Sequence, residues 1–149
     1  MSLEKIINDD IKTAMRAKDK KTLEALRAVK AAILLEKTGK GASGEIAEDA
    51  EMKILQKLVK QRKESALLFN SQGREDLAVD EEFQFAVISK YLPEQMGEDE
   101  IREIIAGVIS ETNASTMKDM GRVMGMSSKK LAGKADNKLI STIVKELLN

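Results

Sequence analysis

The sequence predicts an all-α protein of two units, and three observations support this. Helix-favouring Ala, Leu, Glu and Lys are abundant and runs of β-branched residues are few. Apolar residues also recur at helical spacing through most of the 149 residues. The only proline, Pro93, disfavours helical geometry at the residue before it, so we expect a helix to end near Leu92. The expected domains are therefore 1–92 and 93–149.

Residues 1–92 predict an N-terminal four-helix bundle-like unit. Ser2 and Asp19 are suited to accept hydrogen bonds from the first backbone amides of the first two helices. Glycines mark a loop at 38–44, and Gly73 offers a left-handed end to the third helix. Because the links are short, the helices should pack antiparallel. After the first helix and its polar turn at 18–21, the expected ranges are about 20–37, 46–70 and 74–91.

Residues 93–149 predict a smaller C-terminal bundle of three to four short helices. Three acidic residues at 98–100 suit the positive end of a helix dipole, and that helix should end at 112–114. We expect Ser115 to cap a short methionine-rich helix, with the methionines in the core. Its methionines are Met117, Met120, Met124 and Met126.

The last part of this unit has two expected helix starts. Ser127 or Ser128 can open a short turn that ends at Gly133, and Asp136 can cap the final helix. The inner face of the final helix should consist of Leu139, Ile140, Ile143, Val144 and Leu147.

The residues that support most enzyme chemistry are absent. The chain has no cysteine and no histidine, which removes thiol nucleophiles, disulfides, the commonest general base and the commonest metal ligand. It also has no phosphate-binding glycine loop. Serines lie near lysines in Lys60 to Ser65 and in Ser127-Ser128-Lys129, but a serine nucleophile needs a base, an orienting group and oxyanion donors. We expect no catalytic residue, no cofactor and no metal site.

The apolar runs are shorter than a membrane span requires, and the amino terminus lacks a signal-peptide core. We therefore expect a cytoplasmic protein with no membrane partner.

Charge is segregated along the chain although the net charge is zero. Residues 53–63 contain five Lys/Arg and no acid, and residues 118–138 contain six Lys/Arg and two acids. Two interpretations remain open. These segments are either solvated faces of amphipathic helices or basic surfaces that meet a polyanion.

Two glycines distinguish the second basic segment. Gly121 and Gly125 each cost about 1 kcal/mol relative to alanine inside a helix, so something should approach the helix closely there. That neighbour is either another helix of the same unit or a nucleic-acid backbone. In the second case, lysine and arginine contacts to the phosphates would supply affinity without reading the base sequence. Aromatic stacking platforms are absent, so any RNA partner should be structured and read by shape. The candidate nucleic-acid-binding residues are Lys118, Gly121, Arg122, Gly125, Lys129, Lys130, Lys134 and Lys138.

The chain contains six distinctive sequence blocks: Ala25 to Ile33, Lys60 to Ser65, Gly73 to Ala78, Tyr91 to Gln95, Met117 to Gly125 and Gly133 to Lys138. Together they resemble the YqeY proteins, in which similar blocks occur in the same order over nearly the whole chain. The chain departs from the family pattern at Met126-Ser127-Ser128-Lys129, and Lys134 and Asn137 stand where Arg and Gly are common. Lysine holds a phosphate less well than a bidentate arginine.

The resemblance implies a C-terminal unit similar to the tail of GatB, one of the proteins that make up the tRNA-dependent amidotransferase. That enzyme converts Glu-tRNA(Gln) or Asp-tRNA(Asn) to the amide; the GatB tail engages tRNA while other domains carry the chemistry. This chain contains neither the amidase nor the kinase-like domain of that enzyme. The resemblance therefore implies that the family label of glutamine-dependent carbon–nitrogen ligase describes the amidotransferase and not this chain's own catalysis.

The function we expect is that of a non-catalytic tRNA-binding or amidotransferase-associated protein, with tRNA, amidotransferase subunits or another protein as partner. Two alternatives are a protein–protein adaptor that uses the basic face of the third helix, and an accessory amidotransferase.

Overall fold

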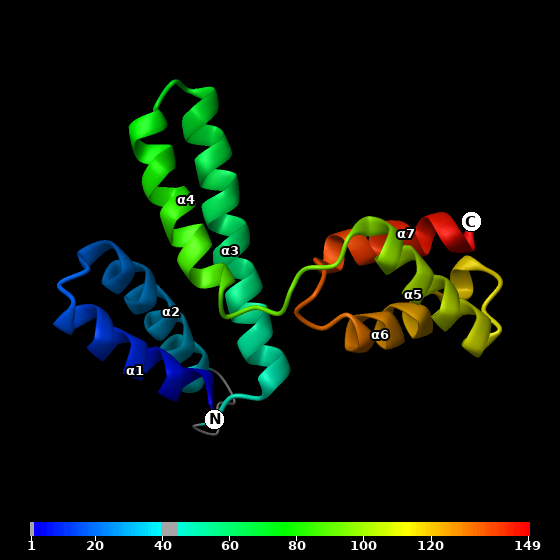
Figure 1. Cartoon of the computed structure of the whole chain (residues 1–149). Helices are drawn as coiled ribbons and strands as arrows, with labels where there is room; N and C mark the ends of the chain where they lie inside the picture. Colours follow the sequence, from blue (N-terminus) through cyan, green and yellow to red (C-terminus); the bar gives the residue numbers. More distant parts are fainter. Residues whose placement is uncertain (1, 40–44) are drawn as a thin grey trace. The chain divides into compact units, whose positions relative to one another are not determined.

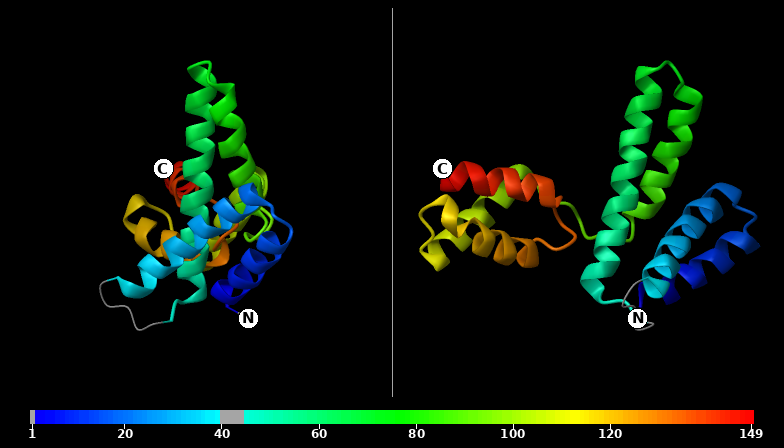
Figure 2. Two further views of the ribbon diagram at one scale, coloured as in Figure 1. Left: turned by 90° about the vertical axis from the view of Figure 1, so that its left-hand side faces the viewer. Right: turned by 180° about the vertical axis from the view of Figure 1, so that it is seen from behind.

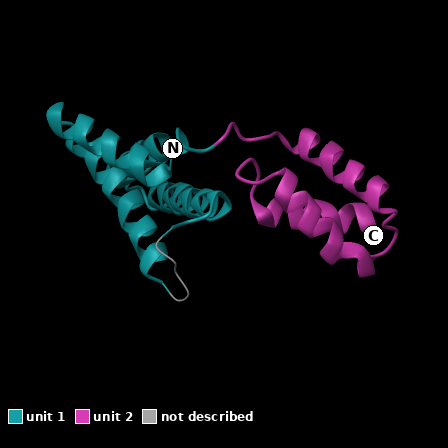
Figure 3. Ribbon diagram, turned by 90° about the horizontal axis from the view of Figure 1, so that it is seen from below, with its two compact units in different colours: residues 1–92 teal, residues 93–149 magenta. Residues whose placement is uncertain are grey.

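The computed structural model describes residues 2–39 and 45–149 (Figure 1). Within them the chain forms seven α-helices, a short 3₁₀-helix and no strand, which confirms the all-helical fold class. The chain divides into two compact units, residues 1–92 (unit 1) and 93–149 (unit 2), coloured separately in Figure 3. Among the described helices, none is long and apolar enough to cross a membrane.

Unit 1 consists of two helical hairpins. Helices α1 and α2 form one hairpin, α3 and α4 form the other, and α2 packs against both α3 and α4 (Figures 1 and 2). The expected bundle-like arrangement is thus present. The helices are α1 (Leu3–Arg16), α2 (Lys20–Thr38), α3 (Glu48–Ser71) and α4 (Glu75–Ser89).

The first two helices begin where their capping residues predict. The Ser2 hydroxyl accepts from the Lys5 amide at 3.3 Å, and an Asp19 carboxylate oxygen accepts from the Thr22 amide at 3.2 Å. A bond from the Thr22 hydroxyl and this amide bond hold the pKa of Asp19 below its usual value. The expected loop at 38–44 cannot be compared in full, because residues 40–44 lie outside the described residues.

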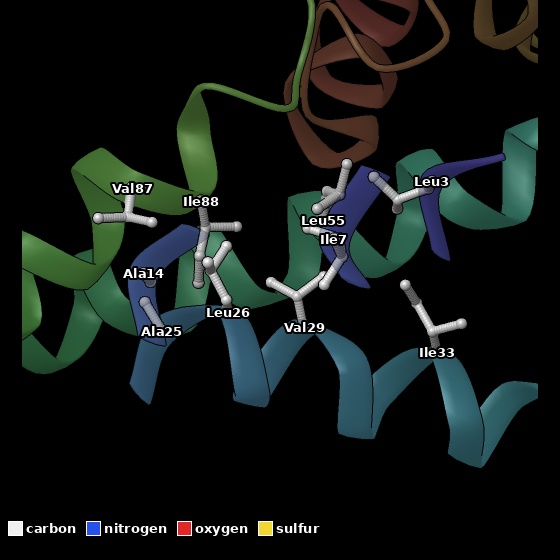
Figure 4. Close-up of a cluster of buried hydrophobic side chains, with 10 residues drawn as sticks. All are labelled: Leu3, Ile7, Ala14, Ala25, Leu26, Val29, Ile33, Leu55, Val87 and Ile88. Atoms are coloured by element: carbon white, nitrogen blue, oxygen red, sulfur yellow. The ribbon is translucent and has the colours of Figure 1, made fainter. Parts of the chain in front are cut away.

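One apolar cluster holds the four helices of unit 1 together. Side chains from all four helices converge in it (Figure 4). Ile7 of α1, Leu55 of α3 and Ile88 of α4 have no exposed surface. Such burial is the main favourable term in folding. The buried members are Leu3, Ile7, Ala14, Ala25, Leu26, Val29, Ile33, Leu55, Val87 and Ile88.

Gly73 ends the α3 helix as expected. Its φ of 72° is left-handed, which glycine adopts without a steric cost. The Arg74 amide donates to the Phe69 carbonyl at 2.8 Å and the Gly73 amide to the Asn70 carbonyl at 3.2 Å, the pattern of a Schellman motif. Helix α4 ends at Ser89, slightly before the expected position, because amides of the residues before Pro93 make turn bonds instead. One example is the Leu92 amide, which donates to the Ser89 carbonyl at 3.1 Å.

Unit 2 is a smaller bundle built around its own apolar cluster. Helix α6 contacts both α5 and α7, and α5 contacts α7. The fully buried residues include Ile105 of α5, Val123 of α6 and Ile143 of α7. The elements are α5 (Glu98–Thr112), the 3₁₀-helix η1 (Met117–Asp119), α6 (Met120–Lys130) and α7 (Asn137–Leu148).

The structure corrects two expected helix starts in unit 2. Thr116, not Ser115, caps η1, because its hydroxyl and the Asp119 carboxylate form a reciprocal capping box. Neither Ser127 nor Ser128 opens a new turn. Helix α6 runs unbroken to Lys130, because the small Ser127 side chain fits into the buried face four residues after Val123.

Two apolar assignments were also wrong. Leu147 is 39% exposed and Leu148 is buried, because Leu148 follows Val144 by four residues and so shares its inward face. Met117 is 45% exposed, whereas the other three methionines of this segment do pack against the core as expected.

The segment around Pro93 is attached to unit 2 beyond the proline and to unit 1 before it. The Gln95 side-chain amide donates to the Gly133 carbonyl at 2.7 Å, and the Met96 amide donates to the Lys134 carbonyl at 3.0 Å. On the other side, the Tyr91 hydroxyl donates to the Asp10 carboxylate. Each unit therefore holds its own end of this segment.

Candidate nucleic-acid interface

The structure brings five of the eight candidate residues onto one exposed helix face. Residues separated by three, four, seven or eleven positions lie along one side of a helix. Val123 and Ser127 are buried on the opposite side of α6, and the five candidates are exposed. We call this surface the α6 outer face. It consists of Lys118 in η1 and of Gly121, Arg122, Gly125 and Lys129 in α6.

Gly121 and Gly125 leave open space above this face. A Cβ atom built at either position would meet no heavy atom within 4 Å. Contact with a neighbouring helix, one of the two neighbours considered from the sequence, is therefore contradicted. The protein carries the propensity cost of two glycines, about 1 kcal/mol each, without an internal packing benefit in the described residues.

Arg122 is held in place by its own unit. One guanidinium nitrogen, Nη2, donates to an Asp119 carboxylate oxygen at 3.2 Å and to the Thr112 carbonyl at 3.1 Å. Since both hydrogens of Nη2 are used, the donors on Nε and Nη1 remain for an outside acceptor. The guanidinium is thus pre-positioned while three of its five donors stay available.

Asp119 fixes Arg122 because it stays ionised. Its carboxylate accepts from the Ser115 amide at 3.0 Å and from the Thr116 amide at 3.4 Å. These backbone bonds, aided by the charge of Arg122, hold the pKa of Asp119 below its usual value. Sequence reasoning missed this role of Asp119. The Thr-x-x-Asp spacing of a capping box was the signal that could have revealed it.

The remaining three candidates lie after the α6 outer face in the chain. Lys130 ends α6 and places its ammonium nitrogen 3.4 Å from a Glu111 carboxylate oxygen. Lys134 is half-buried in the loop after α6, and Lys138 is exposed in the first turn of α7. Within residues 2–39 and 45–149, Lys118, Lys129, Lys134 and Lys138 form no ion pair.

Such a surface is chemically suited to phosphate contacts. Lysine and arginine supply charge, arginine supplies a fixed fork of donors, and glycine allows a backbone to approach closely. The Lys130–Glu111 pair is solvent-exposed and therefore weak, so it can exchange for a phosphate. Unit 2 has no aromatic residue on which bases could stack. No cluster of metal-binding side chains occurs in the part of the chain that the structure describes.

Comparison with known proteins gives the family. The family model described as Yqey-like protein matches residues 4–148. The chain belongs to the YqeY-like protein family. This membership confirms the resemblance found in the six sequence blocks.

Two relatives of this YqeY-like chain are described as altered inheritance of mitochondria protein 41, mitochondrial. The one from Pyrenophora tritici-repentis is 31% identical over 142 residues, which cover 93% of this chain and 77% of the relative. The one from Clavispora lusitaniae is 32% identical over 108 residues, which cover 71% of this chain and 62% of that relative. Their names mention mitochondria and neither tRNA nor an amidotransferase. The expected tRNA role and cytoplasmic location of the YqeY-like chain therefore stay predictions.

Proposed function

We propose that this YqeY-like protein binds the sugar-phosphate backbone of a structured RNA, with tRNA as the first candidate, through the α6 outer face. The observation that carries the proposal is the open space above Gly121 and Gly125, flanked by basic side chains on the same face. A phosphate backbone can approach a helix at glycine more closely than at any other residue. The neighbouring cations then supply the affinity.

The chemistry of unit 2 favours a structured RNA over a single strand. Single-strand binders stack bases on aromatic rings, and residues 93–149 contain none. Phosphate contacts from a rigid helix instead depend on the shape of the nucleic acid, which for an RNA helix differs from that of B-DNA. The resemblance of this unit to the GatB tail supports tRNA as the particular RNA.

The proposal assigns RNA binding and no reaction to this chain. The carbon–nitrogen ligase label of the family would then describe the amidotransferase with which such a protein associates. An accessory role predicts glutamine- and ATP-dependent amide formation only when the amidotransferase subunits are supplied as well.

The first experiment is a binding titration of the full chain with tRNA and with duplex DNA of similar charge, over a salt series. We expect tighter binding to tRNA that persists at physiological salt. Equal and strongly salt-dependent binding to both would contradict the proposal, because it indicates general attraction to polyanions. No binding to either would instead favour the adaptor function without a nucleic-acid role.

A charge-reversal variant tests the surface. The triple variant Lys118→Glu, Arg122→Glu, Lys129→Glu should weaken tRNA binding by more than tenfold and lower the salt slope by about 3, one for each lost phosphate contact. The matched control changes two lysines and one arginine in unit 1: Lys12→Glu, Arg16→Glu, Lys20→Glu. These residues belong to α1 and α2 and lie outside unit 2, so binding should persist.

A second variant tests the remaining candidates. If the interface extends past the α6 outer face, the variant Lys130→Glu, Lys134→Glu, Lys138→Glu also loses binding. Unchanged affinity would restrict the interface to the α6 outer face. Unchanged affinity in both triple variants would refute this surface.

A further inference from the structure

The α3–α4 hairpin extends beyond α1 and α2 at the end where its two helices join (Figures 1 and 2). On this hairpin the structure separates the five basic residues of 53–63 into two groups. Arg62 is half-buried and its Nε donates to the Gln84 side-chain oxygen at 3.2 Å, so it joins α3 to α4. The four lysines are exposed at intervals of three or four residues, which places them along one side of α3. We call this surface the lysine stripe; its residues are Lys53, Lys57, Lys60 and Lys63.

The acids of unit 1 leave most of the charge on the lysine stripe uncompensated. Glu64 is the only acid in residues 52–72. On α4, Asp80 pairs with Lys21 of α2 at 3.7 Å and not with the stripe. The stripe therefore presents positive charge to a partner outside the unit. Its members that form no ion pair among the described residues are Lys53, Lys57 and Lys63.

An apolar notch continues the lysine stripe toward the turn between α3 and α4. The notch has a volume of about 200 Å³ and is lined by residues of these two helices. Leu67, one turn after Lys63, forms part of its wall and is 62% exposed. A partner can therefore remove apolar area from water here. We call this surface the α3–α4 notch; its residues are Lys63, Ala66, Leu67, Asn70, Glu82 and Phe85.

We propose that the lysine stripe and the α3–α4 notch together bind an acidic amphipathic helix of another protein, which places a bulky apolar side chain in the notch. A helix that runs alongside α3 has the same rise per residue, so acids three or four residues apart on it match the lysines. The stripe extends about 15 Å along α3, and the notch lies about one turn further. Charge then sets the register of the partner helix, and the apolar residue anchors it.

The notch distinguishes this partner from an RNA. A phosphate backbone would contact the lysines but has no apolar group to cover Leu67. Bases stack on exposed aromatic rings, and Phe85 is half-buried. An RNA would therefore use the stripe alone, whereas an acidic amphipathic helix uses the stripe and the notch. The proposal is also independent of RNA binding by the α6 outer face, which belongs to unit 2.

The first test uses the full chain and a synthetic helical peptide. The peptide carries glutamates at the spacing of the four lysines and one leucine a turn beyond the last glutamate, and it is made in both chain directions. Fluorescence anisotropy should show saturable binding that weakens at high salt. Replacing the peptide's leucine by alanine should raise the dissociation constant at least fivefold. Equal binding of a peptide with the same residues in scrambled order would overturn the proposal, because it indicates general attraction between charges.

Charge reversal on the protein tests the lysine stripe. Lys57→Glu combined with Lys60→Glu should raise the dissociation constant of the peptide at least tenfold. A peptide with lysines in place of its glutamates should bind this variant better than it binds the wild type. The control is Lys12→Glu combined with Arg16→Glu, which changes the charge equally on α1 and should leave binding of the glutamate peptide unchanged. Equal losses in the two variants would overturn the proposal.

Two leucine variants test the notch. Leu67→Asp should raise the dissociation constant of the glutamate peptide at least tenfold. Leu68→Asp adds the same charge about 100° around the helix, at a side chain that is 55% exposed, and should change the constant less than twofold. Circular dichroism establishes that both variants fold. Equal effects of the two substitutions would contradict an anchor in the notch.

Titration with tRNA separates this proposal from the RNA interface. The variant Lys118→Glu, Arg122→Glu, Lys129→Glu should bind the glutamate peptide as tightly as the wild type. The variant Lys57→Glu, Lys60→Glu should keep its affinity for tRNA. If that variant lost as much affinity for tRNA as for the peptide, the lysine stripe would be a general surface for polyanions and the proposal would fail.

Discussion

Ser127 shows how a residue's role depends on the face it occupies. Its side chain is fully buried in α6, and its hydroxyl oxygen has no hydrogen-bond partner among the described residues. From the sequence, Ser127 or Ser128 is predicted to cap a short turn that ends at Gly133. Serine is also small enough to lie inside a core. Whether Ser127 caps a helix or is buried depends on which face of α6 it occupies, and in the structure it occupies the buried face.

The buried hydroxyl predicts a stabilising substitution. An unpaired buried polar group costs about 1–3 kcal/mol, so Ser127→Ala should raise the free energy of unfolding of unit 2 by about 1 kcal/mol. Denaturant unfolding followed by circular dichroism measures the change. Ser128→Ala, at a half-buried neighbouring position, should stay within about 0.5 kcal/mol of wild type. A loss of stability in Ser127→Ala would mean that the hydroxyl is bonded after all.

At the scale of elements, the two glycines on the outer face of α6 make this helix less stable than alanines would. Gly125→Ala should therefore raise the free energy of unfolding by about 1 kcal/mol, because alanine favours the helix. The new methyl group meets no neighbour within 4 Å, so it introduces no clash. The same methyl group should hinder close approach of an RNA backbone and weaken tRNA binding. Unfolding and binding titrations of one variant measure both effects.

Helix α5 offers the control for this prediction. Gly107 also lies in a helix, and a Cβ atom added there would meet no heavy atom within 4 Å. Gly107→Ala should therefore give the same stabilisation and leave tRNA binding unchanged. Equal loss of binding in both variants would argue against a specific role for the α6 glycines.

The helices themselves could be predicted from sequence because their end signals are local. Ser2, Asp19, Gly73 and Asp136 act close to their own positions in the chain, and each marks a helix boundary in the structure. Helical spacing also indicates that Gly121 and Gly125 share a face. Whether that face is covered depends on tertiary packing, which no local pattern contains. The same holds for the exposure of Leu68 and the burial of Leu148.

At the scale of the whole molecule, the chain has two separate apolar cores. Every buried residue of one cluster comes from unit 1 and every buried residue of the other comes from unit 2. Leu55→Ala should therefore lower the free energy of unfolding of unit 1 by about 2–5 kcal/mol, because it leaves a cavity between α3 and its neighbours. Native-state hydrogen exchange measures the protection of each unit.

The matching variant in unit 2 is Ile105→Ala, at another fully buried position. It should reduce protection in residues 93–149 and leave residues 1–92 protected, the reverse of Leu55→Ala. If either variant lowered protection equally in both units, the chain would unfold as one cooperative body and the two-core description would be incomplete.

The distribution of aromatic rings makes the two units optically unequal. All four rings, Phe69, Phe83, Phe85 and Tyr91, belong to unit 1. Burial and the bond to Asp10 raise the pKa of Tyr91, so its neutral phenol stabilises unit 1 at ordinary pH. That contribution declines as the pH rises above the free value of 10.0. Phenolate absorbance and tyrosine emission thus report on unit 1 alone, because residues 93–149 contain no aromatic side chain that absorbs in the near ultraviolet. A change in the Tyr91 signal when a ligand binds unit 2 would therefore show that the two units are coupled.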